Sequence, residues 1–232
     1  MLSIVIPCYN EEERLPRTIE QIERYLEGKD VDYELILVDD GSTDGTRLVM
    51  DAAAERNRFV RLEALPRNRG KGRALAEGVA VATGSEVLVT DADLSTPIEE
   101  LAKLQAQLEK GAGVAIASRA LRGSRVEVSQ PIYRVLMGKV FNLLVQVVLL
   151  PGIWDTQCGF KLFRADVAHD AFGRLTTDGF GYDPEVLFRA KRRGVKIAEV
   201  PVVWRNSAPT KVSPIKSSID MFKHVVRVRF RS

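Results

Sequence analysis

Residues 3–38 read SIVIPCYNEEERLPRTIEQIERYLEGKDVDYELILV, and this stretch sets the pattern for the fold. It opens and closes on short apolar runs, 3–6 and 34–38, whose β-branched and aliphatic residues favour strands. Between the two runs, apolar residues recur at the spacing of one helix face: Leu15, Ile19, Ile22 and Leu26. The stretch therefore predicts a strand, a helix and a second, parallel strand, which is a βαβ unit.

The same alternation continues along the first half of the chain. Helices are expected at 46–56, at 72–82 and from Pro97 onward, and strands at 60–62, 86–90 and 114–118. Strands that alternate with helices predict an α/β fold, with a mostly parallel sheet that helices cover on both faces. Ligands bind such sheets at the carboxyl ends of the strands.

The second half is less regular. Residues 132–150 predict a mostly apolar helix with one narrow polar stripe, formed by Lys139, Asn142 and Gln146. Short strands or loops are expected at 154–163 and 195–204, with a helix at 184–193 between them. From residue 215 the tail has the pattern of a basic amphipathic helix. Two histidines are expected at the surface and three aromatic residues in the core: His169 and His224, and Trp154, Trp204 and Phe160.

Composition excludes several classes of protein. The chain has 232 residues, of which 45% are hydrophobic and 28% charged, so it is not disordered and fits one domain with at most a small appendage. Cys8 and Cys158 form neither a disulfide framework nor a zinc site, which favours a reducing compartment. We expect no signal peptide, and no apolar run reaches the ~18 residues of a spanning helix.

The positive charge is concentrated in two segments. The net charge is +3, whereas residues 119–139 hold five basic side chains against one acid and residues 211–232 hold six against one. Such clusters suit an anionic partner, although two solvated charged faces would have the same composition.

The strongest local motif is the pair of aspartates in Asp91-Ala92-Asp93, which follows an apolar strand. Alternation along an extended chain points both carboxylates to the same side. Mg²⁺ and Mn²⁺ prefer one or two carboxylates completed by substrate phosphates and water. The alternative is a turn in which Asp93 caps the helix that follows.

Other polar stretches also follow expected strands. Asp39 and Asp40 are placed to bind ribose hydroxyls or base N–H groups, whereas residues 42–46 have turn and helix-cap chemistry. Tyr9 offers a ring to a base and Glu11 an acceptor, but a proline turn with acidic first-turn residues explains them equally well. Lys71 lies before an expected helix, a position where cations and backbone N–H groups bind phosphate oxygens. The sequence around it has neither the spacing of a P-loop nor that of a GxGxxG motif.

In this order and spacing, the motifs closely resemble those of the family-2 glycosyltransferases, which have the GT-A fold. The residues that carry the resemblance are 4–11 (IVIPCYNE), 38–46 (VDDGSTDGT), 68–72 (NRGKG) and 91–93 (DAD). Residues 117–119 (ASR), 155–163 (DTQCGFKLF) and 181–185 (GYDPE) resemble the polyprenyl-phosphate branch of the family. Within that branch the likeness is nearest to the dolichyl-phosphate glucosyltransferases, with the mannosyltransferases next.

The resemblance implies a role for each matching residue. It implies a GT-A catalytic domain over 1–210, with a nucleotide-sugar half at 1–118 and an acceptor half at 119–210, followed by a basic amphipathic tail at 211–232. The implied roles are a nucleoside site at Pro7, Tyr9, Glu11, Asp39 and Asp40; a ribose and diphosphate site at Lys71, Asp91, Ala92 and Asp93; a Mg²⁺ or Mn²⁺ ion on Asp93 and Asp91; an acceptor-phosphate site at Arg119 and Arg134; and a diphosphate contact from Lys211. Ser95 departs from the pattern, because mannosyltransferase relatives often have a glutamine there as a further metal ligand.

The implied reaction is inverting transfer of one sugar from a nucleotide diphosphate sugar to a polyprenyl phosphate. UDP-glucose is the favoured donor and GDP-mannose the second, and no nucleic acid is expected as a partner. The helix at 132–150 and the basic tail are expected to lie at a membrane surface, so that the protein is peripheral on the cytoplasmic face. Three alternatives remain: a soluble transferase acting on a saccharide hydroxyl, an enzyme of nucleotide-sugar synthesis and a membrane adaptor without catalytic activity.

Overall fold

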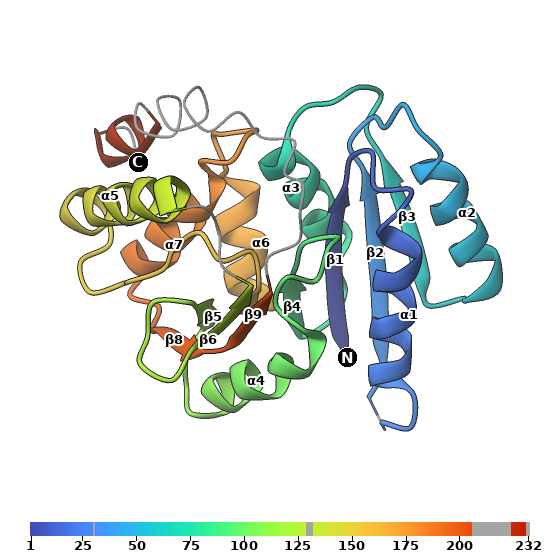
Figure 1. The fold of residues 1–232 in the computed structure, drawn as a ribbon, viewed down its shortest axis with the longest axis horizontal. Coiled ribbons are helices and arrows are strands. Elements are labelled where there is room, and N and C mark those ends of the chain that lie inside the picture. The colour runs from blue at the N-terminus through green and yellow to red at the C-terminus, as the bar shows by residue number, and fades with distance from the viewer. Residues whose placement is uncertain (30, 129–131, 206–223, 231–232) are drawn as a thin grey trace.

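The main sheet has seven strands in the order β3, β2, β1, β4, β7, β5, β8 (Figure 1). The computed structural model describes residues 1–29, 31–128, 132–205 and 224–230, without the side chains of 128, 132–136 and 139. The strands of the sheet are β1 (Leu2–Cys8), β2 (Tyr33–Asp39), β3 (Val60–Ala64), β4 (Glu86–Val89), β5 (Val114–Ser118), β7 (Lys161–Arg164) and β8 (Ile197–Pro201). Neighbouring strands are parallel except around β7, which runs antiparallel to both β4 and β5. The predicted α/β fold with a mostly parallel sheet is confirmed.

Helices cover both faces of this sheet. The helices are α1 (Leu15–Leu26), α2 (Thr46–Arg56), α3 (Lys71–Val81), the 3₁₀ turn η1 (Ile98–Glu100), α4 (Leu101–Glu109), α5 (Ile132–Val148), α6 (Ala165–Gly173) and α7 (Tyr182–Arg192). Alternate residues of β1 point to opposite faces, so Ile4 is buried with α1, α2 and α4 whereas Val5 is buried with α3, α5, α6 and α7. Both faces of the sheet are buried, and the strands β1 and β2 are therefore mostly apolar.

The second half of the chain contains the elements that the sequence did not predict. The helix α6 was not expected, and the antiparallel strand β7 occupies part of the stretch at 154–163 that was assigned to a short strand or loop. Two further strands, β6 (Arg125–Val128) and β9 (Val203–Arg205), form a separate parallel pair. Helix α5 lies at the periphery, on the opposite side of the molecule from α2 (Figure 1). Residues 224–230 are helical, whereas residues 215–223 of the expected tail helix lie outside the described residues.

A buried carboxylate joins the first three strands. Glu34 of β2 is 6% exposed and accepts hydrogen bonds from the hydroxyl of Ser3 (2.6 Å), from the N–H and hydroxyl of Thr83 (2.6 and 2.8 Å) and from the guanidinium of Arg61 (2.7 Å). Burial raises the pKa of Glu34, but the four donors outweigh burial and lower the pKa from its ordinary 4.5 to about 2.

The stability of the fold is therefore expected to depend on the charge of Glu34. Because its pKa is depressed by folding, its contribution is present above pH 4.5 and is lost as the pH falls toward 2. Glu34→Gln should lower the free energy of unfolding by about 1–3 kcal/mol at pH 7 and flatten its dependence on pH below 4.5. Urea unfolding at pH 7, 4 and 3 measures both effects. The exposed Glu55→Gln serves as a control and should change neither; equal curves for the two variants would contradict this role.

Candidate active site

The carboxyl ends of β1, β2 and β4 meet at one edge of the sheet. Cys8 and Asp39 are paired at the ends of β1 and β2, and the N–H of Asp40 donates to the carbonyl of Cys8 (2.8 Å). The N–H of Thr90 donates to the carbonyl of Val5 (3.1 Å), which holds the end of β4 beside β1. The structure thus brings together the acids that sequence analysis placed at strand ends.

Asp39 and Asp40 are both buried at this edge and both hold the backbone of a neighbouring loop. Asp39 accepts from the N–H of Ser42 (2.9 Å), and the two carboxylate oxygens of Asp40 accept from the N–H groups of Arg69 (2.7 Å) and Gly70 (2.8 Å). Burial raises the pKa of Asp40, although these two N–H donors act to lower it. Asp40 therefore fixes the loop that carries Lys71, and its contact with a nucleoside stays a prediction.

The residues after β1 present an aromatic ring to solvent. Tyr9 is 39% exposed, and Pro7 is half-buried in the strand beneath it. The carboxylate of Glu11 accepts two hydrogen bonds from the guanidinium of Arg14 (2.6 and 2.7 Å), and its N–H donates to the hydroxyl of Thr46 (2.6 Å). An exposed ring beside two buried acids suits a planar ligand.

Asp91 forms an ion pair with Lys71, the first residue of α3. Burial raises the pKa of Asp91, but the charges of Lys71, Lys161 and Arg119 outweigh burial and lower it. The metal role predicted for Asp91 stays a prediction; in the structure its negative charge is balanced by Lys71.

Asp93 lies in the turn after β4 and faces open space. It lines a cavity of about 370 Å³ together with Arg14, Arg17 and Arg205. One of its carboxylate oxygens accepts from the N–H of Ser95 (3.0 Å). Burial raises the pKa of Asp93, and the negative charge of Asp91 raises it further. Between the two aspartates, Ala92 is buried and its carbonyl accepts a hydrogen bond from Thr18 of α1 (2.6 Å), which anchors the turn.

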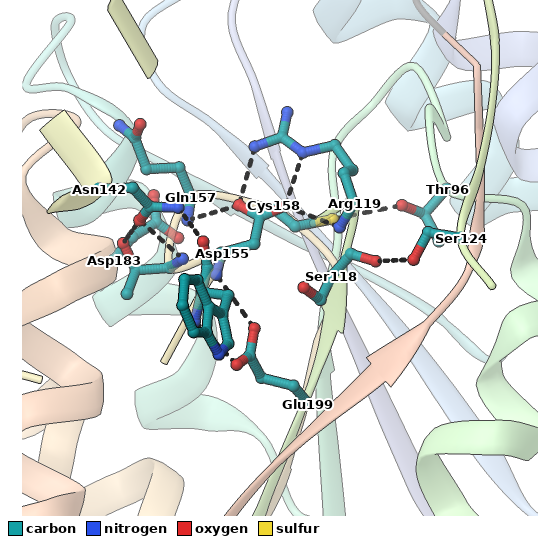
Figure 2. A network of polar contacts seen from close by, with 12 residues as sticks. Thr96, Ser118, Arg119, Ser124, Asn142, Asp155, Gln157, Cys158, Asp183 and Glu199 are labelled. Carbon is teal, nitrogen blue, oxygen red and sulfur yellow. Dashed lines mark hydrogen bonds and ion pairs between the residues drawn. The ribbon is translucent and has the colours of Figure 1, made fainter. Parts of the chain in front are cut away.

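Arg119, directly after β5, is held by a buried carboxylate. Its Nε and Nη2 donate to the two oxygens of Asp155 (2.7 and 2.9 Å), and its backbone N–H donates to the same side chain (2.9 Å). The guanidinium also lies over the ring of Trp204, with 5.3 Å from Cζ to the ring centroid. Figure 2 shows the third nitrogen, Nη1, directed away from Asp155, and no described residue accepts a hydrogen bond from it.

Two basic residues expected at the site are not described in full. Arg134 belongs to α5 but its side chain lies outside the described residues, and so does the whole of Lys211. Their roles stay predictions.

Comparison with known proteins places this site in a family. The family model for glycosyl transferase family 2 matches residues 3–172, which include β1, β2, β4, Asp93 and Arg119. The chain belongs to this family. It is 34% identical over 242 residues to the dolichyl-phosphate beta-glucosyltransferase of Dictyostelium discoideum, an alignment that covers 99% of this chain and 74% of the relative. The human protein of that name is 34% identical (99% and 75% covered) and the yeast protein of Saccharomyces cerevisiae is 31% identical (98% and 74% covered).

Solved structures confirm the GT-A fold expected for a family-2 glycosyltransferase. The glucosyl-3-phosphoglycerate synthase of Mycobacterium tuberculosis, crystallised with Mn²⁺, UDP-glucose and phosphoglyceric acid, matches with a TM-score of 0.72 and 20% identity. The match covers 99% of this chain and 78% of the synthase. The same enzyme in complex with phosphoglyceric acid alone also gives a TM-score of 0.72, at 22% identity and 98% and 78% coverage.

A buried ion pair beneath the family-2 site was missed by sequence reasoning. Lys161 of β7 is fully buried; its ammonium donates to the carbonyl of Cys158 (2.6 Å) and pairs with Asp183. The ring of Tyr182 lies near the ammonium groups of both Lys71 (5.5 Å to the centroid) and Lys161 (5.8 Å). The signal in the sequence was a single charged residue, Lys161, in the otherwise uncharged stretch 156–163.

The burial of two side chains differs from the prediction. His224 is buried, and its Nε2 lies 2.7 Å from the buried carboxylate of Glu185. Trp154 is 56% exposed, in the loop between α5 and β7. The expectations for His224 and Trp154 were therefore wrong, whereas Trp204 and Phe160 are buried as predicted.

Gly159 allows the close approach of the Asp91 carboxylate. A Cβ at position 159 would overlap this carboxylate, so a larger residue would displace Asp91 from Lys71. We expect Gly159→Ala to slow sugar transfer ~10-fold or more, because small displacements of positioning groups are costly. The matched control is Gly173→Ala, at the end of α6, where a Cβ meets nothing within 4 Å. Release of nucleotide from the sugar donor gives the rates; indistinguishable rates for the two variants would rule out this constraint.

Helix α5 of the family-2 enzyme presents an apolar face. Val140, Leu143 and Val147 are 62%, 62% and 76% exposed, and exposed Trp154 follows in the next loop. The opposite side of α5 is buried through Phe141 and Val145, so the helix covers the sheet and also leaves an apolar stripe open. Among the described residues, no helix has both the length and the apolar character needed to cross a membrane.

Proposed function

We propose that this family-2 glycosyltransferase transfers one glucose from UDP-glucose to a polyprenyl phosphate of the dolichyl type, with inversion at the anomeric carbon. The observation that carries the proposal is the similarity to dolichyl-phosphate beta-glucosyltransferases, which extends over 99% of the chain and so includes both the strand-end acids and Arg119. In this proposal residues 1–118 hold the donor and residues 119–210 the acceptor.

The donor is assigned to the edge formed by β1, β2 and β4. The exposed ring of Tyr9 stacks on the base, and Pro7, Glu11, Asp39 and Asp40 surround the nucleoside. Lys71 lies at the start of α3, where its ammonium and the positive end of the helix dipole favour phosphate oxygens.

A divalent cation fits Asp93. Within the described ranges, no three acidic, histidine or cysteine side chains gather into a ready-made metal cage. Mg²⁺ and Mn²⁺ need none when one or two carboxylates and the oxygens of a diphosphate complete the coordination. Asp93 supplies such a carboxylate beside an open cavity, with Asp91 as a second candidate. The cation, when bound, stabilises the negative charge of the departing diphosphate.

The acceptor phosphate is assigned to Arg119. Its Nη1 has no acceptor among the described residues, while Asp155 fixes the plane of the guanidinium. A phosphate monoester carries a charge of about −1.5 to −2 at neutral pH, so it needs positioning more than deprotonation. The phosphate oxygen forms the new bond to the anomeric carbon as the bond from that carbon to UDP breaks. We assign Arg134 and Lys211 to the acceptor phosphate and the donor diphosphate, as the family resemblance implies.

The lipid part of the acceptor is assigned to a membrane surface on which α5 lies. The apolar stripe of α5 and the exposed ring of Trp154 are at the same end of the acceptor half, and the basic charge of residues 119–139 and 211–232 suits anionic head groups. We place the enzyme as a peripheral protein on the cytoplasmic face; its two cysteines are unpaired, which is compatible with a reducing compartment.

Binding to vesicles tests the role of α5. Leu143→Glu with Val147→Glu is expected to weaken binding to vesicles of phosphatidylcholine and phosphatidylserine ~10-fold or more, because each charge removes apolar contact with the lipid. The control is Leu48→Glu on α2, where the leucine is 75% exposed at the opposite side of the molecule. Flotation of the vesicles measures the bound fraction; equal loss in both variants would contradict a lipid-facing α5.

The proposed reaction is tested with a panel of donors and acceptors. UDP-glucose and GDP-mannose are each offered to the purified enzyme with Mn²⁺ and, as acceptors, polyprenyl phosphate, free glucose or 3-phosphoglycerate. We expect glucose to appear on polyprenyl phosphate, and the product to be a β-linked glucosyl phosphate from an α-linked donor. Transfer only to a water-soluble acceptor, or only from GDP-mannose, would overturn the proposal.

A further inference from the structure

The loop that holds Arg119 is itself held by α5. Asn142, on this helix, donates from its side-chain nitrogen to the carbonyl of Trp154. Its side-chain oxygen accepts from the hydroxyl of Thr156 (3.0 Å) and from the N–H of Thr156 (3.3 Å). The side chain of Asn142 is therefore hydrogen-bonded to both residues that flank Asp155 (Figure 2).

Asp155 is positioned from the other side by β8. The carboxylate of Glu199 accepts from the N–H of Trp154 (2.8 Å) and from the N–H of Asp155 (3.0 Å). Asp155 is 2% exposed, and its two carboxylate oxygens accept the hydrogen bonds from Nε and Nη2 of Arg119. Thr156 is fully buried, so a change at Asn142 would leave its backbone and hydroxyl without this acceptor.

We propose that Asn142 is a positioning residue, which orients Arg119 toward the acceptor phosphate through the Trp154–Thr156 backbone and Asp155. The inference rests on the proposed function, because it takes the acceptor of Arg119 to be a lipid phosphate. It adds a link between α5 and Arg119 that the family resemblance does not assign. Helix α5 carries the exposed side chains of Val140 and Leu143. Through Asn142, this helix is hydrogen-bonded to the loop that carries Asp155, the partner of Arg119.

Steady-state kinetics with both substrates test this role. Asn142→Ala is expected to raise KM for polyprenyl phosphate ~10-fold, the scale of one or two lost hydrogen bonds, with KM for UDP-glucose within about twofold of wild type. The control is Gln146→Ala, one turn further along α5, where the half-buried side chain makes no hydrogen bond to a described residue; it should leave both KM values unchanged. Vesicle binding of the two variants should be equal.

A double-mutant cycle separates positioning from general damage. Arg119→Lys keeps a cation but loses the bidentate geometry, so it should raise KM for polyprenyl phosphate on its own. If Asn142 acts through Arg119, adding Asn142→Ala to Arg119→Lys should raise this KM less than twofold further. Independent, multiplicative effects on KM, or an equal rise for UDP-glucose, would overturn the inference.

A measurement without catalysis keeps the inference separate from the proposed function. The Nε–H of Arg119, donated to Asp155 at 2.7 Å, gives an NMR signal that is assigned by its loss in Arg119→Lys. Its exchange with solvent should accelerate ~10-fold in Asn142→Ala and not in Gln146→Ala. If the wild-type enzyme glucosylates no polyprenyl phosphate, the proposed function fails, whereas unchanged exchange of this signal contradicts the positioning role whatever the substrate.

Discussion

Asp93→Asn is expected to lower kcat/KM for glucose transfer by about 10²-fold or more. The substitution keeps the size of the side chain and removes the negative charge that faces the cavity beside α1. A neutral amide holds Mg²⁺ or Mn²⁺ weakly, so the charge that develops on the departing UDP loses its stabilisation. Initial rates at saturating Mn²⁺ with UDP-glucose and polyprenyl phosphate give the effect.

Two controls make this result specific. Asp51→Asn changes an aspartate of α2 that pairs with Arg47 on the surface, and it should retain wild-type activity. Thermal stabilisation by UDP should require Mn²⁺ in the wild type and be lost in Asp93→Asn, since a ligand that binds only the folded state raises its stability. Activity within threefold of wild type in Asp93→Asn would remove this residue from the reaction.

Lys161→Met is expected to lower the free energy of unfolding by about 3–5 kcal/mol. Lys161 is fully buried in β7, and its removal leaves the carboxylate of Asp183 and the carbonyl of Cys158 without their partner in the interior. A midpoint of thermal unfolding lower by roughly 10 °C follows for a chain of this size.

A surface pair and a double variant test the reason for this loss. Arg24→Met breaks the exposed pair with Glu20 and should cost less than about 1 kcal/mol. Adding Asp183→Leu to Lys161→Met removes the stranded charge and should recover part of the lost stability. Denaturation by urea compares all three variants; a cost for Lys161→Met no larger than that for Arg24→Met would contradict the importance of this pair.

The first half of the chain was predictable because its signals are local. Strands β2 and β4 are short apolar runs followed by acids, and parallel strands bring such acids to one edge, as observed for Asp39, Asp40, Asp91 and Asp93. The helices at 46–56 and 72–82 were predicted within one or two residues of α2 and α3 for the same reason.

The second half of the chain was harder to predict because its contacts connect residues far apart in the sequence. Arg119 and its partner Asp155 are 36 positions apart, and His224 and Glu185 are 39 apart, so nothing near either residue indicates the pairing. Strand β7 is antiparallel between two parallel strands, an insertion that a pattern of alternating elements does not reveal. Trp154 was assigned to the core from its residue type, whereas its place in a loop beside α5 leaves it exposed.

The most direct test of the account is a crystal structure of the enzyme with UDP-glucose and Mn²⁺, with the cation located by its anomalous scattering. We expect the uracil on Tyr9 and the Mn²⁺ peak at bonding distance from the carboxylate of Asp93 and from the diphosphate. A nucleotide bound away from the ends of β1, β2 and β4, or a Mn²⁺ ion with no contact to Asp93, would contradict the central claim.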